Sequence, residues 1–186
     1  MSGFAGASFG NVQIDADFME IELSFHCRNL KKLDTMSNTD PFCVAFLSEP
    51  PKNTPPPASG AQGGLLSFSN GMKPQKSMNA VEIGRTTVVY DTQNPDFATT
   101  FKVKYHFEEN QMLTVKVFDE DKKGSSNLRD HDYIGCVTVS LGQLMGSEGN
   151  TASCQIRGSK NSQGYCAIRA EEVSFGAEGE GARKAE

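Results

Sequence analysis

The stretch from Met112 to Leu141 reads MLTVKVFDEDKKGSSNLRDHDYIGCVTVSL, and its pattern changes twice. Apolar and polar residues alternate up to Phe118, and the alternation returns after Asp132. Alternation with a period of two is typical of a β-strand with one buried face. The residues between are polar and acidic, so the stretch predicts two strands joined by an exposed loop.

The same alternation recurs along the chain. In residues 100–107, TFKVKYHF, it places Phe101 and Phe107 on the predicted buried face. A long amphipathic helix is not evident, and SLGQLMG (140–146) has room for about one turn. The sequence therefore predicts an all-β fold, an eight-stranded antiparallel β-sandwich. The predicted strands are 20–27, 41–47, 82–90, 100–107, 112–118, 133–141, 153–157 and 165–173.

Composition excludes several classes of function. The formal net charge of −5 argues against a nucleic-acid partner, because proteins that bind nucleic acids usually carry an excess of basic residues. The five cysteines form no CxxC pair, so buried thiols in a cytoplasmic protein are expected instead of a disulfide framework. The start of the chain lacks the pattern of a secretory signal. We find no GxSxG, P-loop or HExxH motif, and the chain is not expected to be an enzyme.

The chain divides into a core and polar flanks. We expect an N-terminal extension at 1–18, one domain at 19–174, and a disordered tail or linker at 175–186. Residues 48–80 are rich in Pro, Gly, Ser and Asn, which predicts a mobile insertion inside the domain.

Two acidic loops are the main candidates for a site. Asp119, Asp121, Asp130 and Asp132 lie in one loop, and residues 30–42 form a second. Loops at one end of a sandwich can converge, and a dense set of hard oxygen ligands suits Ca²⁺. The predicted cup consists of Asp34, Asp40, Asp119, Asp121 and Asp132, with Asp130 as a candidate additional ligand.

An EF-hand is the nearest competing motif. Asp119, Asp121 and Gly124 match its positions 1, 3 and 6. Lys123 occupies position 5, however, and Asp130 stands where a bidentate glutamate is normal. Because the flanks read as strands and not helices, we reject this interpretation.

In order and spacing, three segments resemble a C2 domain, the calcium-dependent phospholipid-binding sandwich. LDTMSNTDPF (33–42) is similar to its first calcium-binding loop, TQNPDF (92–97) to its NP-x-F/W turn, and VFDEDKKGSSNLRDHDYIG (117–135) to its third calcium-binding loop. The likeness covers about residues 19–173 and is greatest to the first C2 domain of copines. It implies type II topology and the five aspartate ligands named above.

The loops indicate how such a domain would meet a membrane. We expect calcium-dependent recruitment to anionic, phosphatidylserine-like phospholipid, at the inner face of the plasma membrane when calcium rises. The expected contacts are basic and apolar side chains of the loops: Met36, Lys122, Lys123, Leu128 and Arg129. Lys102, Lys104 and Lys116 are a candidate phosphoinositide patch, or else an ordinary polar strand face.

A second interpretation keeps the fold and changes the function. The domain would be a calcium-independent scaffold for protein partners, docking them through the insertion at 48–80. Leu65, Leu66 and Phe68 are apolar residues in that otherwise polar stretch. Deleting the insertion would separate the two interpretations.

Overall fold

The computed structural model describes residues 18–32, 39–48, 80–158 and 162–173. The insertion at 48–80 therefore lies almost wholly outside the described residues, as do the extension before Phe18 and the tail after Val173. The strands are β1 (Phe18–Arg28), β2 (Pro41–Ser48), β3 (Ala80–Arg85), β4 (Phe101–His106), β5 (Met112–Asp119), β6 (Asp132–Ser140), β7 (Thr151–Arg157) and β8 (Ser162–Glu172). The helices are η1 (Leu128–Asp130), α1 (Leu141–Met145) and η2 (Glu148–Asn150).

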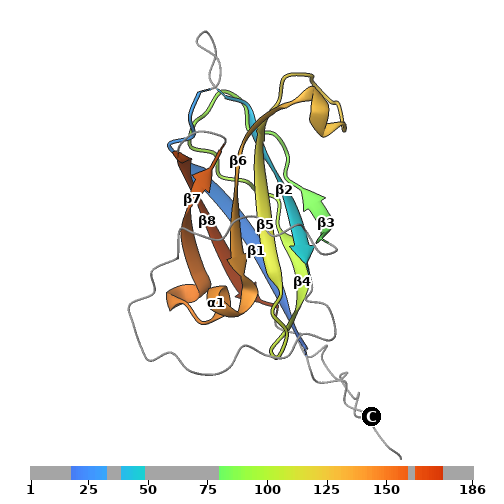
Figure 1. The fold of residues 1–186 in the computed structure, drawn as a ribbon, viewed down its shortest axis with the longest axis vertical. Coiled ribbons are helices and arrows are strands. Elements are labelled where there is room, and N and C mark those ends of the chain that lie inside the picture. The colour runs from blue at the N-terminus through green and yellow to red at the C-terminus, as the bar shows by residue number, and fades with distance from the viewer. Residues whose placement is uncertain (1–17, 33–38, 49–79, 159–161, 174–186) are drawn as a thin grey trace, which may run out of the picture.

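The eight strands pack as two antiparallel halves, which confirms the predicted sandwich. Their order is β3-β2-β5-β6-β7-β8-β1-β4, and β6 meets β7 through one registered pair, Cys136 with Arg157. Figure 1 shows β2, β3, β5 and β6 on one side and β7, β8 and β1 on the other. The last strand, β8, lies between β7 and β1, as the type II arrangement requires.

Alternating side chains form the core between the halves. Ile21, Leu23 and Phe25 of β1 are fully buried, while the residues between them are half-buried. Phe107 departs from the predicted pattern, because its side chain is 57% exposed. β4 ends at His106, whose carbonyl accepts a hydrogen bond from the backbone N–H of Glu109, so the chain turns at Phe107 before the alternation can continue.

The third strand is shorter than the predicted 82–90. The residue before Arg85, Gly84, has a φ of 154°, and a β-bulge interrupts the pairing with β2 between Ala45 and Phe46. Beyond the strand the chain still follows β2, through bonds from the N–H of Thr86 to Cys43 O and from Val89 to Pro41 O. The bulge changes the path of the chain. Residues 86–97 form most of a long connection between β3 and β4, at one end of the sandwich.

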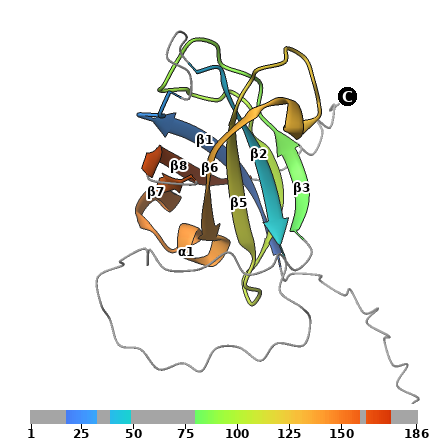
Figure 2. The same ribbon diagram turned by 45° about the horizontal axis from the view of Figure 1, so that its top comes forward.

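The two ends of the sandwich differ. Residues 29–32 after β1 and the segments that follow β3 and β5 lie at the upper end of Figure 1, and Figure 2 brings this end forward. The opposite end carries α1, as well as the β4–β5 hairpin. Among the described residues, none of the helices has the length and apolar character needed to cross a membrane.

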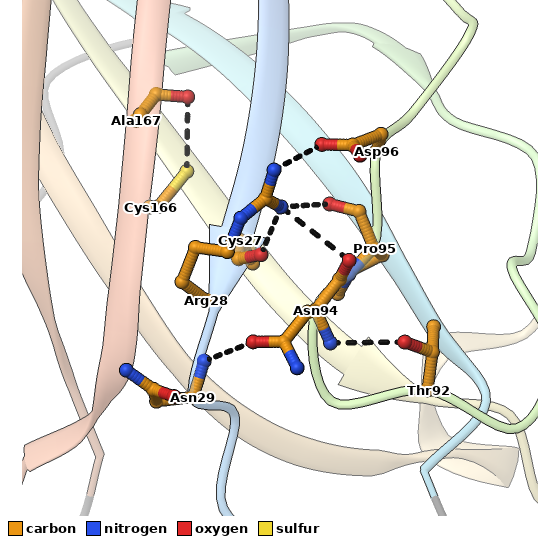
Figure 3. A network of polar contacts seen from close by, with 9 residues as sticks. All are labelled: Cys27, Arg28, Asn29, Thr92, Asn94, Pro95, Asp96, Cys166 and Ala167. Carbon is orange, nitrogen blue, oxygen red and sulfur yellow. Dashed lines mark hydrogen bonds and ion pairs between the residues drawn. The ribbon is translucent and has the colours of Figure 1, made fainter.

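The connection at 86–97 is fastened to β1 by polar contacts (Figure 3). Arg28 donates from Nη1 to the carbonyl oxygens of Asn94 and Pro95, at 3.4 and 3.3 Å, and from Nη2 to Oδ1 of Asp96 at 2.6 Å. The backbone N–H of Asn29 donates to the Asn94 side-chain oxygen at 2.9 Å. These bonds hold the NP turn against the end of β1.

Replacing Asn94 with alanine tests this attachment. The change removes the acceptor for the Asn29 N–H, so we expect the free energy of unfolding to fall by about 1 kcal/mol. The amide of Asn29 should also exchange faster with solvent, which NMR hydrogen exchange measures.

Asn110→Ala is the matched control, because Asn110 is also exposed and its oxygen meets only Ser140 Oγ, at 3.4 Å, among the described hydrogen bonds. Equal losses of stability in the two variants, with unchanged exchange at Asn29, would contradict the role given to Asn94.

Candidate acidic site at one end of the sandwich

Three of the predicted ligands stand in a row at the ends of three neighbouring strands. Asp40 comes immediately before β2, Asp119 ends β5 and Asp132 begins β6. In the strand register, Asp119 is paired with Pro41 on one side and with Asp132 on the other. Antiparallel pairing therefore gathers carboxylates that are far apart in the sequence.

Hydrogen bonds fix two of these carboxylates in place. Asp119, which is 9% exposed, accepts the backbone N–H of Asp40 on Oδ1 at 2.7 Å. The Oδ1 of Asp40 accepts the backbone N–H of Asp91 at 2.7 Å, and its carbonyl accepts that of Glu120 at 3.0 Å. Asp40 thus connects β2 both to the 86–97 connection and to the loop after β5.

Asp91 is a candidate that the sequence reasoning missed. It is exposed, has a φ of 56°, and is bound through its N–H to Asp40. A non-glycine residue with positive φ is uncommon, although aspartate tolerates it better than most. The sequence signal was an aspartate just before the TQNP turn, at the end of a predicted strand.

Asp121 and Asp130 differ in their surroundings. Asp121 is exposed, two residues beyond the end of β5. Asp130 accepts a hydrogen bond from Ser125 Oγ at 2.6 Å and lies 3.4 Å from Lys122 Nζ. The Ser125 bond, followed by Lys122, lowers the pKa of the Asp130 carboxyl. Because the charge of Asp130 is partly balanced within its loop, the geometry favours Asp132, in register with Asp119, as the member of the row.

The loop after Asp121 folds back onto the outer face of β2 and β5. His131 is buried, its Nε2 donates to Ser125 O at 3.0 Å, and its ring meets the Phe42 ring edge-on at 5.1 Å. Leu128 in η1 is half-buried against a cluster of Phe42, Val44 and Phe118. Part of the Leu128 side chain therefore packs on the protein, and its insertion into a membrane stays a prediction.

A groove of about 220 Å³ lies between this loop and β3. Figures 1 and 2 show the η1 segment above the end of β3. Arg85 ties the two together, because its Nη1 donates to Ser126 O at 2.6 Å while its Nε donates to Glu82 at 2.7 Å. The groove is lined by Phe42, Arg85, Thr86, Val88, Glu120, Gly124, Ser125, Ser126 and His131.

The predicted basic contacts of this loop are on its surface. Lys122, Lys123 and Arg129 are exposed, and Lys123 Nζ lies 5.4 Å from the centre of the Tyr90 ring. Partial desolvation raises the pKa of the Tyr90 hydroxyl, and the negative charges of Glu120 and Asp40 raise it further. Cations and carboxylates therefore stand side by side at this end of the molecule.

The three lysines of the candidate phosphoinositide patch do not lie on neighbouring strands. Lys102 and Lys104 belong to β4, where they pair with Glu22 and Glu20 of β1. Lys116 belongs to β5, which is in the other half of the strand order. The prediction of one patch made by all three lysines is therefore wrong. In addition, Glu22 and Glu20 lie directly opposite Lys102 and Lys104 and offset their positive charge.

The donor chemistry of the row fits calcium, since all its side chains offer hard oxygen atoms. Among the described residues, however, no three Asp, Glu, His or Cys side chains are arranged as a group that could hold a metal ion. Asp34 and Met36 lie outside the described residues, so the predicted contribution of the first loop rests on the sequence.

Comparison with known proteins finds similarity to C2 domains and to copines. The family model for the C2 domain matches residues 75–156. Copine-D of Dictyostelium discoideum is 28% identical over 156 residues, which are 83% of this chain and 25% of the relative. Copine-E of the same organism is 29% identical over 154 residues, 83% of this chain and 22% of the relative. The chain thus spans about a quarter of the length of these curated relatives.

Solved structures give the same fold. A C2 domain of plant Extended Synaptotagmin 1 matches with a TM-score of 0.51 and 16% identity, over 84% of this chain and 96% of that one. Human GIVD cytosolic phospholipase A2 matches with a TM-score of 0.50 and 18% identity, over 85% of this chain and 17% of that one. This chain therefore has the fold of a C2 domain, its residues 75–156 match the C2 family model, and its sequence is similar to those of copines.

Proposed function

We propose that this domain binds anionic phospholipid membranes in response to calcium, and does so without catalysis. The observation that carries the proposal is the row of Asp40, Asp119 and Asp132 on adjacent strand ends, with Asp91 and Asp121 close by. Like charges gathered in this way repel, so an oxygen-seeking cation is favoured among them. Asp34 is a predicted further ligand from the first loop.

Calcium, when bound, would supply positive charge and open coordination positions for lipid phosphate oxygens. The residues of this chain do the rest. Asp119 and Asp40 hold the loop backbones in place, and Lys122, Lys123 and Arg129 offer their charges to an anionic surface. An anionic leaflet attracts each nearby cation by about 1 kcal/mol.

The proposed setting follows from this chemistry. Anionic phosphatidylserine-like lipid is concentrated in the cytoplasmic leaflet. We therefore infer a cytoplasmic protein that moves to the inner face of the plasma membrane when calcium rises. Co-sedimentation with phosphatidylserine/phosphatidylcholine vesicles, in millimolar calcium or in chelator, tests the proposal, and pelleting with calcium alone is expected. Pelleting in neither condition would favour the calcium-independent protein scaffold.

The first variant removes charge from the acidic row and leaves its backbone bonds in place. In Asp119→Asn with Asp121→Asn, an amide oxygen at position 119 still accepts the Asp40 N–H. Loss of two carboxylates should lower the apparent calcium affinity by roughly tenfold or more, about 1.4 kcal/mol or above. Calcium titration of vesicle pelleting measures this.

Glu108→Gln with Glu109→Gln is the matched control, since it removes two exposed charges from the hairpin after β4, at the opposite end. Calcium-dependent pelleting of Asp119→Asn with Asp121→Asn at the wild-type level would refute the proposed site. A loss of binding in both double variants would point to net charge and not to the acidic row.

The second pair of variants locates the membrane-facing cations. Lys122→Ala with Lys123→Ala should weaken vesicle binding by up to about 2 kcal/mol at low salt, because about 1 kcal/mol is gained per cation near an anionic surface. The difference from wild type should shrink at high salt, where exposed charges are screened. Binding isotherms at two salt concentrations measure both effects.

Lys102→Ala with Lys104→Ala serves as the comparison, because these lysines already face Glu22 and Glu20. We expect this pair to bind vesicles as wild type does. If Lys102→Ala with Lys104→Ala lowers vesicle affinity more than Lys122→Ala with Lys123→Ala, the lipid contact lies on the face of β4 and not on the loop.

A further inference from the structure

Three thiols meet in the centre of the sandwich. Cys27 of β1, Cys43 of β2 and Cys166 of β8 are all fully buried. The thiols of Cys43 and Cys166 both lie beside that of Cys27. The cluster therefore joins the two halves of the fold, and Figure 3 shows Cys27 and Cys166 on their adjacent strands.

The strand register favours one pair among these cysteines. Cys27 and Cys166 are directly opposite each other in the β1–β8 ladder. The N–H of Cys27 donates to Pro95 O at 3.0 Å and its carbonyl accepts from Arg28 Nη1 at 2.7 Å, so both backbone groups point away from β8. The two cysteines are thus a non-hydrogen-bonded pair, for which antiparallel strands bring the Cα atoms to about 4.5 Å.

This separation suits a disulfide, whose Cα atoms are usually about 4.4–6.8 Å apart. Cys154 also lies opposite Cys166, on β7. Because the backbone groups of Cys166 point away from β1 and toward β7, that pair is hydrogen-bonded, and its side chains are farther apart. Cys43 comes from the other half of the sandwich and has no such register with Cys27.

The chemistry of the cluster is that of thiols and not of a metal site. The described part of the chain contains no cysteine-bearing group arranged to hold a metal ion. Hydrogen bonds from Cys166 and Cys43 lower the pKa of the Cys27 thiol, whereas burial raises that of Cys43. Both Cys27 and Cys166 are fully buried, so the strand register, and not exposure, selects this pair.

The geometry points to an oxidative modification site in which a peroxide converts Cys27 and Cys166 into a disulfide. The Cys27 sulfur attacks the O–O bond of hydrogen peroxide, which forms a sulfenic acid and releases one water. The Cys166 sulfur then displaces the hydroxyl group as a second water, and the S–S bond forms. Two thiols are oxidised by two electrons, and one peroxide is reduced.

A disulfide at Cys27 would also affect the 86–97 connection at the acidic end, through Arg28. Arg28 follows Cys27 directly and holds the carbonyls of Asn94 and Pro95 as well as Asp96. A cross-link from β1 to β8 fixes the strand end that carries this arginine. The inference does not depend on calcium or lipid binding, because it rests on the cysteines alone.

The test is peptide mapping of the full chain after hydrogen peroxide treatment under native conditions, followed by alkylation and trypsin. Trypsin places the three cysteines in different peptides, 1–28, 33–52 and 161–169. We expect the peptides with Cys27 and Cys166 to be joined, and reduction by dithiothreitol to separate them. Oxidation in denaturant, where register is lost, should give a mixture of pairs instead.

Variants then identify the partner. In Cys166→Ala the cross-linked peptide should be absent, while Cys43→Ala should form it as wild type does. The unmodified chain also tests the inference, without relying on any variant to fold. If Cys136 or Cys154 oxidises while the thiols of Cys27 and Cys166 can still be alkylated, the inference is wrong. A native cross-link between the peptides of Cys27 and Cys43 would overturn it as well.

Discussion

The antiparallel register of β2, β5 and β6 is the constraint on which the acidic end depends. It sets Asp119 between Pro41 and Asp132, and thereby places Asp40, Asp119 and Asp132 in one row. A slip of one residue would exchange the faces of β5 and expose Val115 and Val117, which are fully buried. The apolar core therefore fixes the position of the carboxylates, although it contains none of them.

Side chains provide hydrogen-bond partners for backbone groups that the strand pairing leaves unpaired. The 86–97 connection continues past the bulge at β3 without belonging to a regular strand, so its backbone groups need other partners. The carboxylate of Asp40 accepts one of its N–H groups, and the guanidinium of Arg28 takes two of its carbonyl oxygens. These contacts join β1, β2 and the connection, and they give the acidic end a defined shape.

How far the sequence predicts this arrangement depends on the range of the interactions. Period-two alternation is local, and it was enough to predict the eight strands and the sandwich. The packing of Leu128 on Phe42 and the separation of Lys116 from Lys102 depend on which strands become neighbours. Asp91 escaped notice because its link to Asp40 joins residues that are 51 positions apart.

The residues proposed to bind calcium also hold this end of the fold together. Each carboxylate has two oxygens, so a backbone N–H on one oxygen leaves room for coordination through the same group. Asp119 is nearly buried and would serve both purposes under the proposed function, whereas Asp121 is exposed. Because Asp40 and Asp119 are already oriented by backbone hydrogen bonds, a bound cation would need to order fewer groups, and less binding free energy would be lost to ordering. Stability and calcium binding are therefore expected to be coupled at Asp40 and Asp119.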